Sequence, residues 1–107
     1  MGLVEPLREA LTSIARNITA AFVFGSVAKR SDTAASDIDV LIVSDSVDYA
    51  DAFAALQLAE ARLGRKVNPA VYTLADWRRK RKAGNAFVTK VSAQPKMFVF
   101  GTEESLG

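Results

Sequence analysis

The sequence has 107 residues, half of them hydrophobic and 24% charged, which fits one compact domain over residues 1–107 with a modest core. It contains neither Cys nor His, which excludes disulfides, thiolate chemistry, histidine general bases and the commonest zinc ligand. The first ten residues, MGLVEPLREA, lack the basic start and apolar stretch of a signal peptide, and no run approaches about 18 apolar residues. We therefore expect a soluble, cytoplasmic protein that does not contact a membrane.

The charged residues are segregated along the chain, although the formal net charge is only +2. Residues 32–51 hold six Asp and no Lys or Arg, whereas residues 62–82 hold eight Lys or Arg and Asp76 as the one acid. An acidic half beside a basic half suits a site that binds a metal on one side and a polyphosphate on the other. It also suits two solvated helix faces of opposite sign, and charge alone favours that second interpretation.

Hydrophobic spacing and termination signals predict the first four elements. Pro6 favours the backbone conformation of a first helical turn, and apolar residues at helical spacing follow it. A later helix is indicated by acids in its first turn, Arg62 in its last turn and Gly64 just beyond, and its predicted buried face includes Phe53. Two apolar runs between these helices are typical of buried strands. The expected helix, strand, strand and helix span Glu5–Arg16, Ala20–Phe24, Ile38–Val43 and Asp48–Leu63.

Four more elements are predicted in the remaining chain. A strand at Lys66–Tyr72 contains Pro69, which cannot donate to a neighbouring strand and therefore favours a sheet edge or a bulge. Thr73 and Asp76 have capping-box spacing at the start of a basic helix that ends before Gly84. A short helix at Ala86–Ala93 and a strand at Lys96–Phe100, closed by Gly101, follow, and we expect the polar tail at residues 102–107 to fray. This order predicts an α/β (α+β) fold with a small mixed sheet flanked by helices.

Asp37 and Asp39 open the second predicted strand. Successive side chains of a strand alternate, so these two carboxylates point to one side with Cα atoms roughly 6.6 Å apart. Two half-buried carboxylates repel each other and lose solvation, so they need open solvent or a cation. Magnesium is the expected cation, because it is commonly held by one or two carboxylates and substrate phosphates.

Gly25 and Ser26 close the first predicted strand. A glycine after a strand lets the backbone approach a ligand closely, and a hydroxyl and backbone N–H groups can hold phosphate oxygens. A phosphate-binding turn beside a pair of metal-binding carboxylates indicates a nucleoside triphosphate site.

Gly25-Ser26, ten intervening residues and Asp37-Ile38-Asp39 at a strand start together resemble the signature of the polymerase-β-like nucleotidyltransferase superfamily, in particular its minimal nucleotidyltransferase domains. Similar small bacterial proteins also share a G-x-x-V-N-P-x-V-Y-T stretch and a terminal P-K-x-F-x-x-G, found here at residues 64–73 and 95–101. The resemblance covers most of the chain, roughly residues 7–106. It implies the nucleotidyltransferase fold.

The resemblance also implies a role for each matching residue. Gly25 and Ser26 would contact the nucleotide phosphates, and Asp37 and Asp39 would bind Mg²⁺, in a one- or two-metal site, as the catalytic carboxylates. The reaction would be in-line attack of a hydroxyl of a protein or small molecule on the α-phosphate.

Two positions depart from the family pattern. Active members usually add a third carboxylate from a neighbouring strand, where this chain offers Asn68, an amide that can bind Mg²⁺ but cannot act as a base. Asp76 is favoured as a helix cap and Glu60 as a solvated residue. The loop after Gly25-Ser26 commonly reads Ala-Arg-Gly, whereas here Arg30 replaces the glycine; Lys29 and Arg30 could still bind a triphosphate by charge.

Two functions remain open. The first is an enzyme that moves a nucleotide to a partner, as in two-component systems whose antitoxin nucleotidylates a companion helical toxin. The second is a catalytically weak or inactive nucleotide-binding module, serving as an antitoxin or as one half of a regulator with a DNA-binding domain. Direct nucleic-acid contact by the basic run 77–82 is not expected, because its charges point several ways and Trp77 is expected in the core. The oligomeric state stays open.

Overall fold

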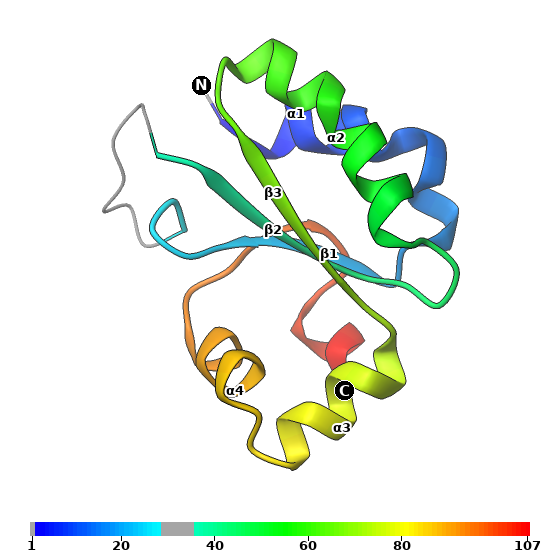
Figure 1. Cartoon of the computed structure of the whole chain (residues 1–107), viewed down its shortest axis with the longest axis vertical. Helices are drawn as coiled ribbons and strands as arrows, with labels where there is room; N and C mark the ends of the chain where they lie inside the picture. The colour runs from blue at the N-terminus through cyan, green and yellow to red at the C-terminus, as the bar shows by residue number, and fades with distance from the viewer. Residues whose placement is uncertain (1, 29–35) are drawn as a thin grey trace.

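The chain, seen in a computed structural model that describes residues 2–28 and 36–107, forms a four-stranded mixed sheet with helices on both faces (Figure 1). The sheet order is β3-β2-β1-β4, with β1 antiparallel to both neighbours and β2 parallel to β3. The elements in chain order are α1 Val4–Leu11, a 3-10 helix Thr12–Asn17, β1 Ala20–Phe24, β2 Ile38–Val43, α2 Tyr49–Leu63, β3 Val67–Tyr72, α3 Leu74–Lys82, α4 Ala86–Ala93, β4 Met97–Phe100 and a 3-10 helix Glu103–Leu106.

The predicted fold class and the predicted order of helices and strands are confirmed. The bounds of β1, β2 and α4 agree with the predicted ranges, and β3 is an edge strand, as Pro69 requires. The first helix differs, because it is α-helical only to Leu11 and then tightens into a 3-10 turn. The Thr12 hydroxyl donates to the Arg8 carbonyl at 2.9 Å, an example of the local hydrogen bonds by which Ser and Thr compete with helix backbone.

The two faces of the sheet carry different cores. On the face covered by α1 and α2 the buried side chains are Leu, Ile, Val and Ala, including Leu7 and Leu56, and partly buried Met97 and Phe100 pack against them. The face covered by α3, α4 and the C-terminal 3-10 helix is aromatic, with Phe22 and Trp77 fully buried and in edge contact. Trp77 is therefore a core residue, as predicted, and stays out of reach of a nucleic acid.

Three local predictions were wrong, those for Phe53, for Glu60 and for the C-terminal tail. Phe53 is 43% exposed, because α2 turns Ala52, Leu56 and Ala59 to the core. Glu60 is not simply solvated, since its carboxylate accepts a hydrogen bond from the Val67 backbone N–H at 2.7 Å and so holds the start of β3.

The C-terminal tail does not fray. It forms a 3-10 helix whose Leu106 is 1% exposed and packs in the aromatic core. Arg78 and Arg81 of α3 donate hydrogen bonds to the backbone oxygens of Leu106 and Gly107. The tail and part of the basic run thus hold each other in place. Among the described residues, no helix has the length and apolar character that a membrane crossing requires.

Candidate nucleotide and metal site

Sheet topology brings the predicted site residues to one end of the sheet. Because β1 and β2 are antiparallel, the end of β1 at Phe24 pairs with Asp39 near the start of β2. Gly25 and Ser26 form the turn that follows β1. The parallel pairing of β2 with β3 places Asn68 opposite Asp39. Residues that are 43 positions apart in sequence, from Gly25 to Asn68, therefore lie around one point.

Gly25 lies directly against Asp39. Its φ is +78°, a conformation that L side chains rarely adopt, and a Cβ atom built on it would lie 2.8 Å from Oδ2 of Asp39. Both the backbone conformation and the close approach therefore require glycine. The predicted phosphate turn and the predicted metal-binding carboxylate are neighbours in space.

The two carboxylates differ in their surroundings. Asp37 is exposed and accepts a hydrogen bond from the Asn68 amide, with Nδ2 of Asn68 3.1 Å from Oδ2 of Asp37. Asp39 is partly buried, and this burial raises the pKa of its carboxyl above the ordinary value. A hydrogen bond from Asn68 lowers that pKa, and the charge of Asp37 raises it further. The Asn68 amide thus lies against both carboxylates.

The backbone ahead of Asp37 is held by a residue that sequence reasoning treated only as a charge. Arg65 donates from Nε and Nη2 to the Ser36 carbonyl oxygen, at 2.9 and 2.8 Å. The Ile38 N–H donates to the Lys66 carbonyl at 2.8 Å. Arg65 therefore holds the backbone just before Asp37 and β2, a role that becomes visible only once β2 and β3 are known to be parallel.

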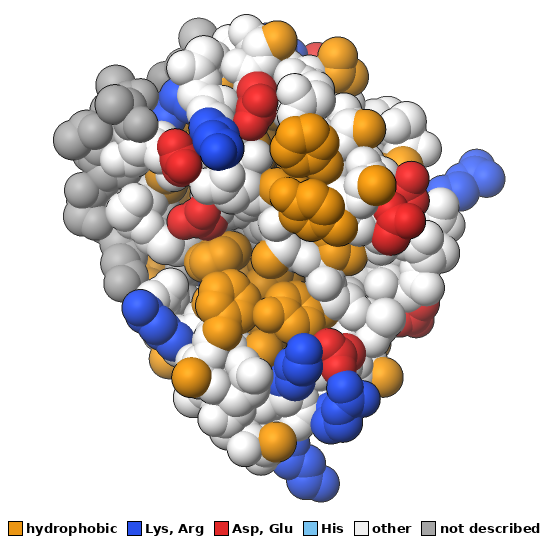
Figure 2. All heavy atoms as spheres, viewed as in Figure 1, with side chains coloured by type: hydrophobic (Ala, Val, Ile, Leu, Met, Phe, Trp, Pro, Cys, Tyr) orange, Lys and Arg blue, Asp and Glu red, His pale blue; other side chains and the backbone are white. Residues whose placement is uncertain are grey.

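Helix α4 forms a wall of the site that the sequence did not predict. A cavity of about 190 Å³ beside Gly25 and Asp39 is lined on its other side by residues of α4 and by its C-cap. Its lining residues are Phe24, Gly25, Asp39, Phe87, Lys90, Val91 and Gln94. Figure 2 shows hydrophobic side chains gathered in the middle of this face of the molecule, with both acidic and basic side chains above them and mostly basic side chains below.

Among the described residues, no third acid joins Asp37 and Asp39. Within residues 2–28 and 36–107, no group of three or more acidic side chains is arranged to hold a metal ion. Asp76 instead forms ion pairs with Arg79 and Lys80, and its N–H donates to the Thr73 hydroxyl at the start of α3. Asp76 thus lies in the first turn of α3, as predicted, but Thr73 supplies the cap and the Asp76 carboxylate does not. Asn68 is the residue that stands beside the acidic pair.

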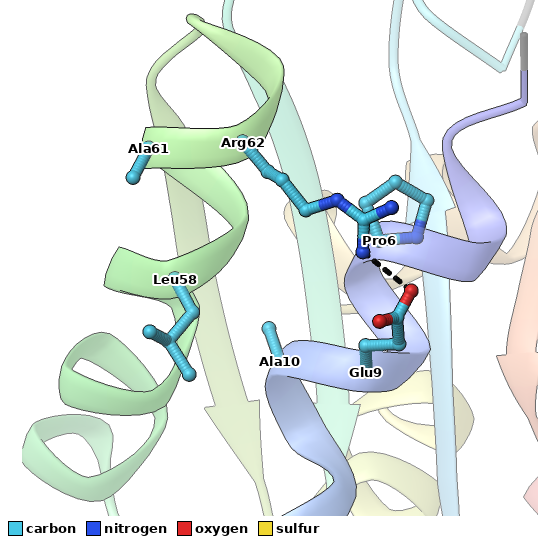
Figure 3. A pocket seen from close by; sticks show the side chains of 6 residues that line it. All are labelled: Pro6, Glu9, Ala10, Leu58, Ala61 and Arg62. Atoms are coloured by element: carbon cyan, nitrogen blue, oxygen red, sulfur yellow. Dashed lines mark hydrogen bonds and ion pairs between the residues drawn. The ribbon is translucent and has the colours of Figure 1, made fainter.

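The predicted phosphate contacts Lys29 and Arg30 lie outside the described residues. A larger cavity, of about 460 Å³, lies between α1 and α2, where Glu9 and Arg62 form an ion pair across it (Figure 3). None of the predicted site residues lines that cavity. Cavity size alone therefore does not mark the site.

The fold and this group of residues define a nucleotidyltransferase-like domain. The sequence profile of the family described as "Polymerase beta, Nucleotidyltransferase" matches residues 7–82. This match covers more than half of the chain, and the chain belongs to that family.

Solved structures resemble the chain over nearly its whole length. A toxin–antitoxin crystal structure with AMP-PNP has a TM-score of 0.69 and 19% identity, covering 96% of this chain and 77% of that one. A mutant of the toxin–antitoxin pair MntA–HpeT has a TM-score of 0.66 and 17% identity, covering 96% and 76%. The pair MntA–HepT has a TM-score of 0.61 and 18% identity, covering 97% and 77%. At identities this low, the structural likeness establishes the shared fold and nothing further. No curated protein matches the sequence.

Proposed function

We propose that the chain binds a nucleoside triphosphate with Mg²⁺ at the end of β1 and β2 and transfers a nucleotide to a hydroxyl group of a partner protein or small molecule. One observation carries this proposal. In a chain of this family, the Gly25 turn touches Asp39, and Asp37 and Asn68 stand beside it. The phosphate-binding and cation-binding halves of a nucleotide site are thus adjacent.

The residues at this point fit a divalent cation. Two carboxylates supply hard oxygen ligands, and the raised pKa of Asp39 shows that burial and the neighbouring charge of Asp37 disfavour its ionised form. A cation would relieve both effects. When bound, Mg²⁺ would neutralise charge on the attacking and leaving oxygens of the transfer. Asp37 and Asp39 would hold it, with the amide oxygen of Asn68 as a further candidate ligand.

The chain's own residues orient the nucleotide. The backbone of Gly25 can approach a phosphate closely because the residue has no side chain, and the Ser26 hydroxyl can donate to a phosphate oxygen. In the transfer, an oxygen–phosphorus bond forms between the acceptor hydroxyl and the α-phosphate, and the bond from the α-phosphorus to the bridging oxygen breaks, so pyrophosphate leaves. The hydroxyl proton passes to water, because the Asn68 amide cannot accept it.

Asn68 also supports a second function, a nucleotide-binding module with weak or no turnover. Such a module would act by the structure it adopts when nucleotide is bound, as an antitoxin or as a regulatory domain. Both functions need the same nucleotide site and differ only in whether a nucleotide is transferred. A normal transfer rate in the natural protein would exclude the second.

The solved relatives indicate which partner to test. They are described as toxin–antitoxin structures, one of them with AMP-PNP. A companion toxin is therefore our first choice of acceptor, and a DNA-binding regulator domain the second. The predicted cytoplasmic location, where nucleoside triphosphates are abundant, is consistent with either.

Nucleotide binding is tested by the melting temperature of the protein with each of the four ribonucleoside triphosphates, with Mg²⁺ and after EDTA. We expect at least one nucleotide to raise the melting temperature only when Mg²⁺ is present, because a ligand of the native state alone stabilises it by mass action. Transfer is then tested with α-labelled nucleotide and the protein encoded beside this one. No shift with any nucleotide at millimolar concentration would refute the proposal.

A further inference from the structure

We propose that the cavity between the end of β1 and α4 holds the base of the nucleotide, with the ring of Phe87 as its stacking surface. This inference rests on the proposed function and adds to it the place of the nucleoside. Helix α4 begins at Ala86, beyond the residues 7–82 that match the family. The family match therefore assigns no role to Phe87, Lys90 or Gln94.

Phe87 is an exposed aromatic residue whose ring is held in place. It is 40% exposed, yet its ring lies edge-on to Phe24, at 5.9 Å between centroids, and parallel to Tyr72 within 14°, at 6.3 Å. Contacts with two aromatic neighbours fix the ring plane, so little conformational entropy would be lost when a base stacks on it. Base stacking on such a ring is a general mode of nucleotide recognition.

The polar residues of the cavity suit a nucleotide that extends from it. Lys90 and Gln94 follow Phe87 by three and seven positions in the chain and line the same cavity. The Gln94 amide offers a donor and an acceptor for the edge of a base. Lys90 forms no ion pair within the described residues, so its ammonium is available to a phosphate. Gly25 and Asp39 close the cavity on the side of the phosphate turn.

The volume of the cavity limits which part of the nucleotide can bind in it. Pockets for whole drug-sized ligands measure about 300–1,000 Å³, whereas this cavity measures about 190 Å³. It can hold a base but not a complete nucleoside triphosphate. The triphosphate would then lie outside, along Gly25 and Ser26, next to Asp37 and Asp39.

The cavity lies on the nucleotide side of the acidic pair. The cavity borders Gly25 at the end of β1 and Asp39 of β2. Asn68 belongs to β3, which lies on the other side of β2 from β1. An acceptor hydroxyl must approach the α-phosphate from the side away from the leaving pyrophosphate. The α4 cavity borders the turn at Gly25 as well as Asp39, and we therefore assign the base, not the acceptor, to it.

The test compares Phe87→Leu with the natural protein by calorimetry, using Mg²⁺ with the best-bound nucleoside triphosphate and Mg²⁺ with inorganic tripolyphosphate. Leu keeps an apolar side chain against Phe24 and Tyr72 but removes the aromatic face. We expect nucleotide affinity to fall about tenfold and tripolyphosphate affinity to stay unchanged. Phe53→Ala is the matched control, because Phe53 is 43% exposed on α2, away from the cavity.

Each other outcome refutes the inference in a distinguishable way. Equal loss for nucleotide and tripolyphosphate in Phe87→Leu, at an unchanged melting temperature, would assign Phe87 to the phosphate site or its support. Unchanged nucleotide affinity would show that the base binds elsewhere. If the natural protein binds tripolyphosphate as tightly as nucleotide, the base pocket is wrong while the phosphate and metal site stands. If it binds neither, the proposed function fails as well.

Discussion

Two pairs of aspartates, with eight residues between them along the chain, have opposite relations to the fold. Asp48 and Asp51 cap α2 reciprocally, because the Asp48 carboxylate accepts from the Asp51 N–H at 2.8 Å and the Asp51 carboxylate accepts from the Asp48 N–H at 3.4 Å. Asp37 and Asp39 share one side-chain amide, that of Asn68, and burial raises the pKa of Asp39. The first pair completes a helix, whereas the second pair is the proposed cation site.

The difference follows from what the backbone provides at each place. The first turn of a helix has N–H groups without partners inside the helix, so carboxylates there stabilise the fold. The start of a central strand has its N–H groups engaged by neighbouring strands, as the Ile38 N–H is by Lys66. Carboxylates placed there cannot serve the backbone. We therefore treat these two acidic residues, which lie beside the turn at Gly25, as a candidate ligand site.

The largest expected effect comes from removing each pair in turn. We expect Asp37→Ala with Asp39→Ala to abolish the rise in melting temperature caused by Mg²⁺ and nucleotide, and to leave the ligand-free protein as stable or slightly more stable, because two repelling charges are gone. Asp48→Ala with Asp51→Ala should lower the free energy of unfolding by about 1 kcal/mol, as loss of a helix cap does. That second variant should keep the full response to ligand.

Thermal and urea unfolding of both variants, with and without ligand, measure the two effects. A preserved ligand response in the Asp37 and Asp39 variant would remove these residues from the site. A lost response in the Asp48 and Asp51 variant would show that any weakening of the fold impairs binding, and would leave the first result without meaning for the site.

The next largest effect separates two glycines with the same backbone conformation. Gly25 has φ +78° and a Cβ there would meet Asp39, whereas Gly84 has φ +77° and a Cβ there would meet nothing within 4 Å. Gly25→Ala and Gly84→Ala should both lose roughly 1–2 kcal/mol of stability, the cost of a left-handed conformation for alanine. Only Gly25→Ala should also displace the Asp39 carboxylate and remove nucleotide binding, as calorimetry can show. Equal binding by the two variants would mean that Asp39 can move without consequence.

The fold was predictable because its signals are local. Glycine and proline marked element ends, β-branched runs marked β1 and β2, and the spacing of Gly25 and Asp37 matched a known family. The errors concern what depends on tertiary packing. Phe53 had helical spacing for the core but α2 buries a neighbouring stripe, and Leu106 had a polar context but α3 and the aromatic core hold it.

The site was predictable only in part, for the same reason. Motif residues of one β-hairpin can be found from sequence because a hairpin places nearby residues together. Arg65, Phe87 and Lys90 reach the site only through the parallel pairing of β2 with β3 and the docking of α4 beside Gly25. No local pattern encodes those two arrangements. In the sequence, Arg65 is one of eight basic residues in the segment 62–82, and Phe87 is one apolar residue of a short predicted helix.

A smaller effect, opposite in sign, is expected at Asn68. Asn68→Asp would place a third carboxylate beside Asp37 and Asp39, so we expect binding of Mg²⁺ with nucleotide to tighten about tenfold and labelled transfer to accelerate, since a carboxylate can accept the hydroxyl proton. The ligand-free protein should lose stability, because the donor to Asp37 is replaced by a like charge. Asn17→Asp, at the end of the 3-10 helix Thr12–Asn17 that precedes β1, adds the same charge away from the site and serves as control.

The transfer rate of the natural protein determines how the Asn68→Asp result is interpreted. If it already transfers nucleotide at a normal rate and Asn68→Asp is slower, then Asn68 does not limit catalysis and the enzyme function gains support. If Asn68→Asp loses stability and binds no more tightly than the natural protein, the position does not face the metal.

The smallest expected effect compares two hydroxyl groups, as the first prediction compared two acid pairs. The Thr73 hydroxyl accepts from the Asp76 N–H at 3.0 Å and caps α3, whereas Ser26 lies exposed in the turn after Gly25. Ser26→Ala should weaken nucleotide binding about fivefold through one lost hydrogen bond to a phosphate, with little change in unfolding free energy. Thr73→Ala should cost about 1 kcal/mol of stability and leave nucleotide affinity unchanged. Calorimetry and urea unfolding of both variants check this, and a stability loss of several kcal/mol in Ser26→Ala would make Ser26 a structural residue and not a phosphate ligand.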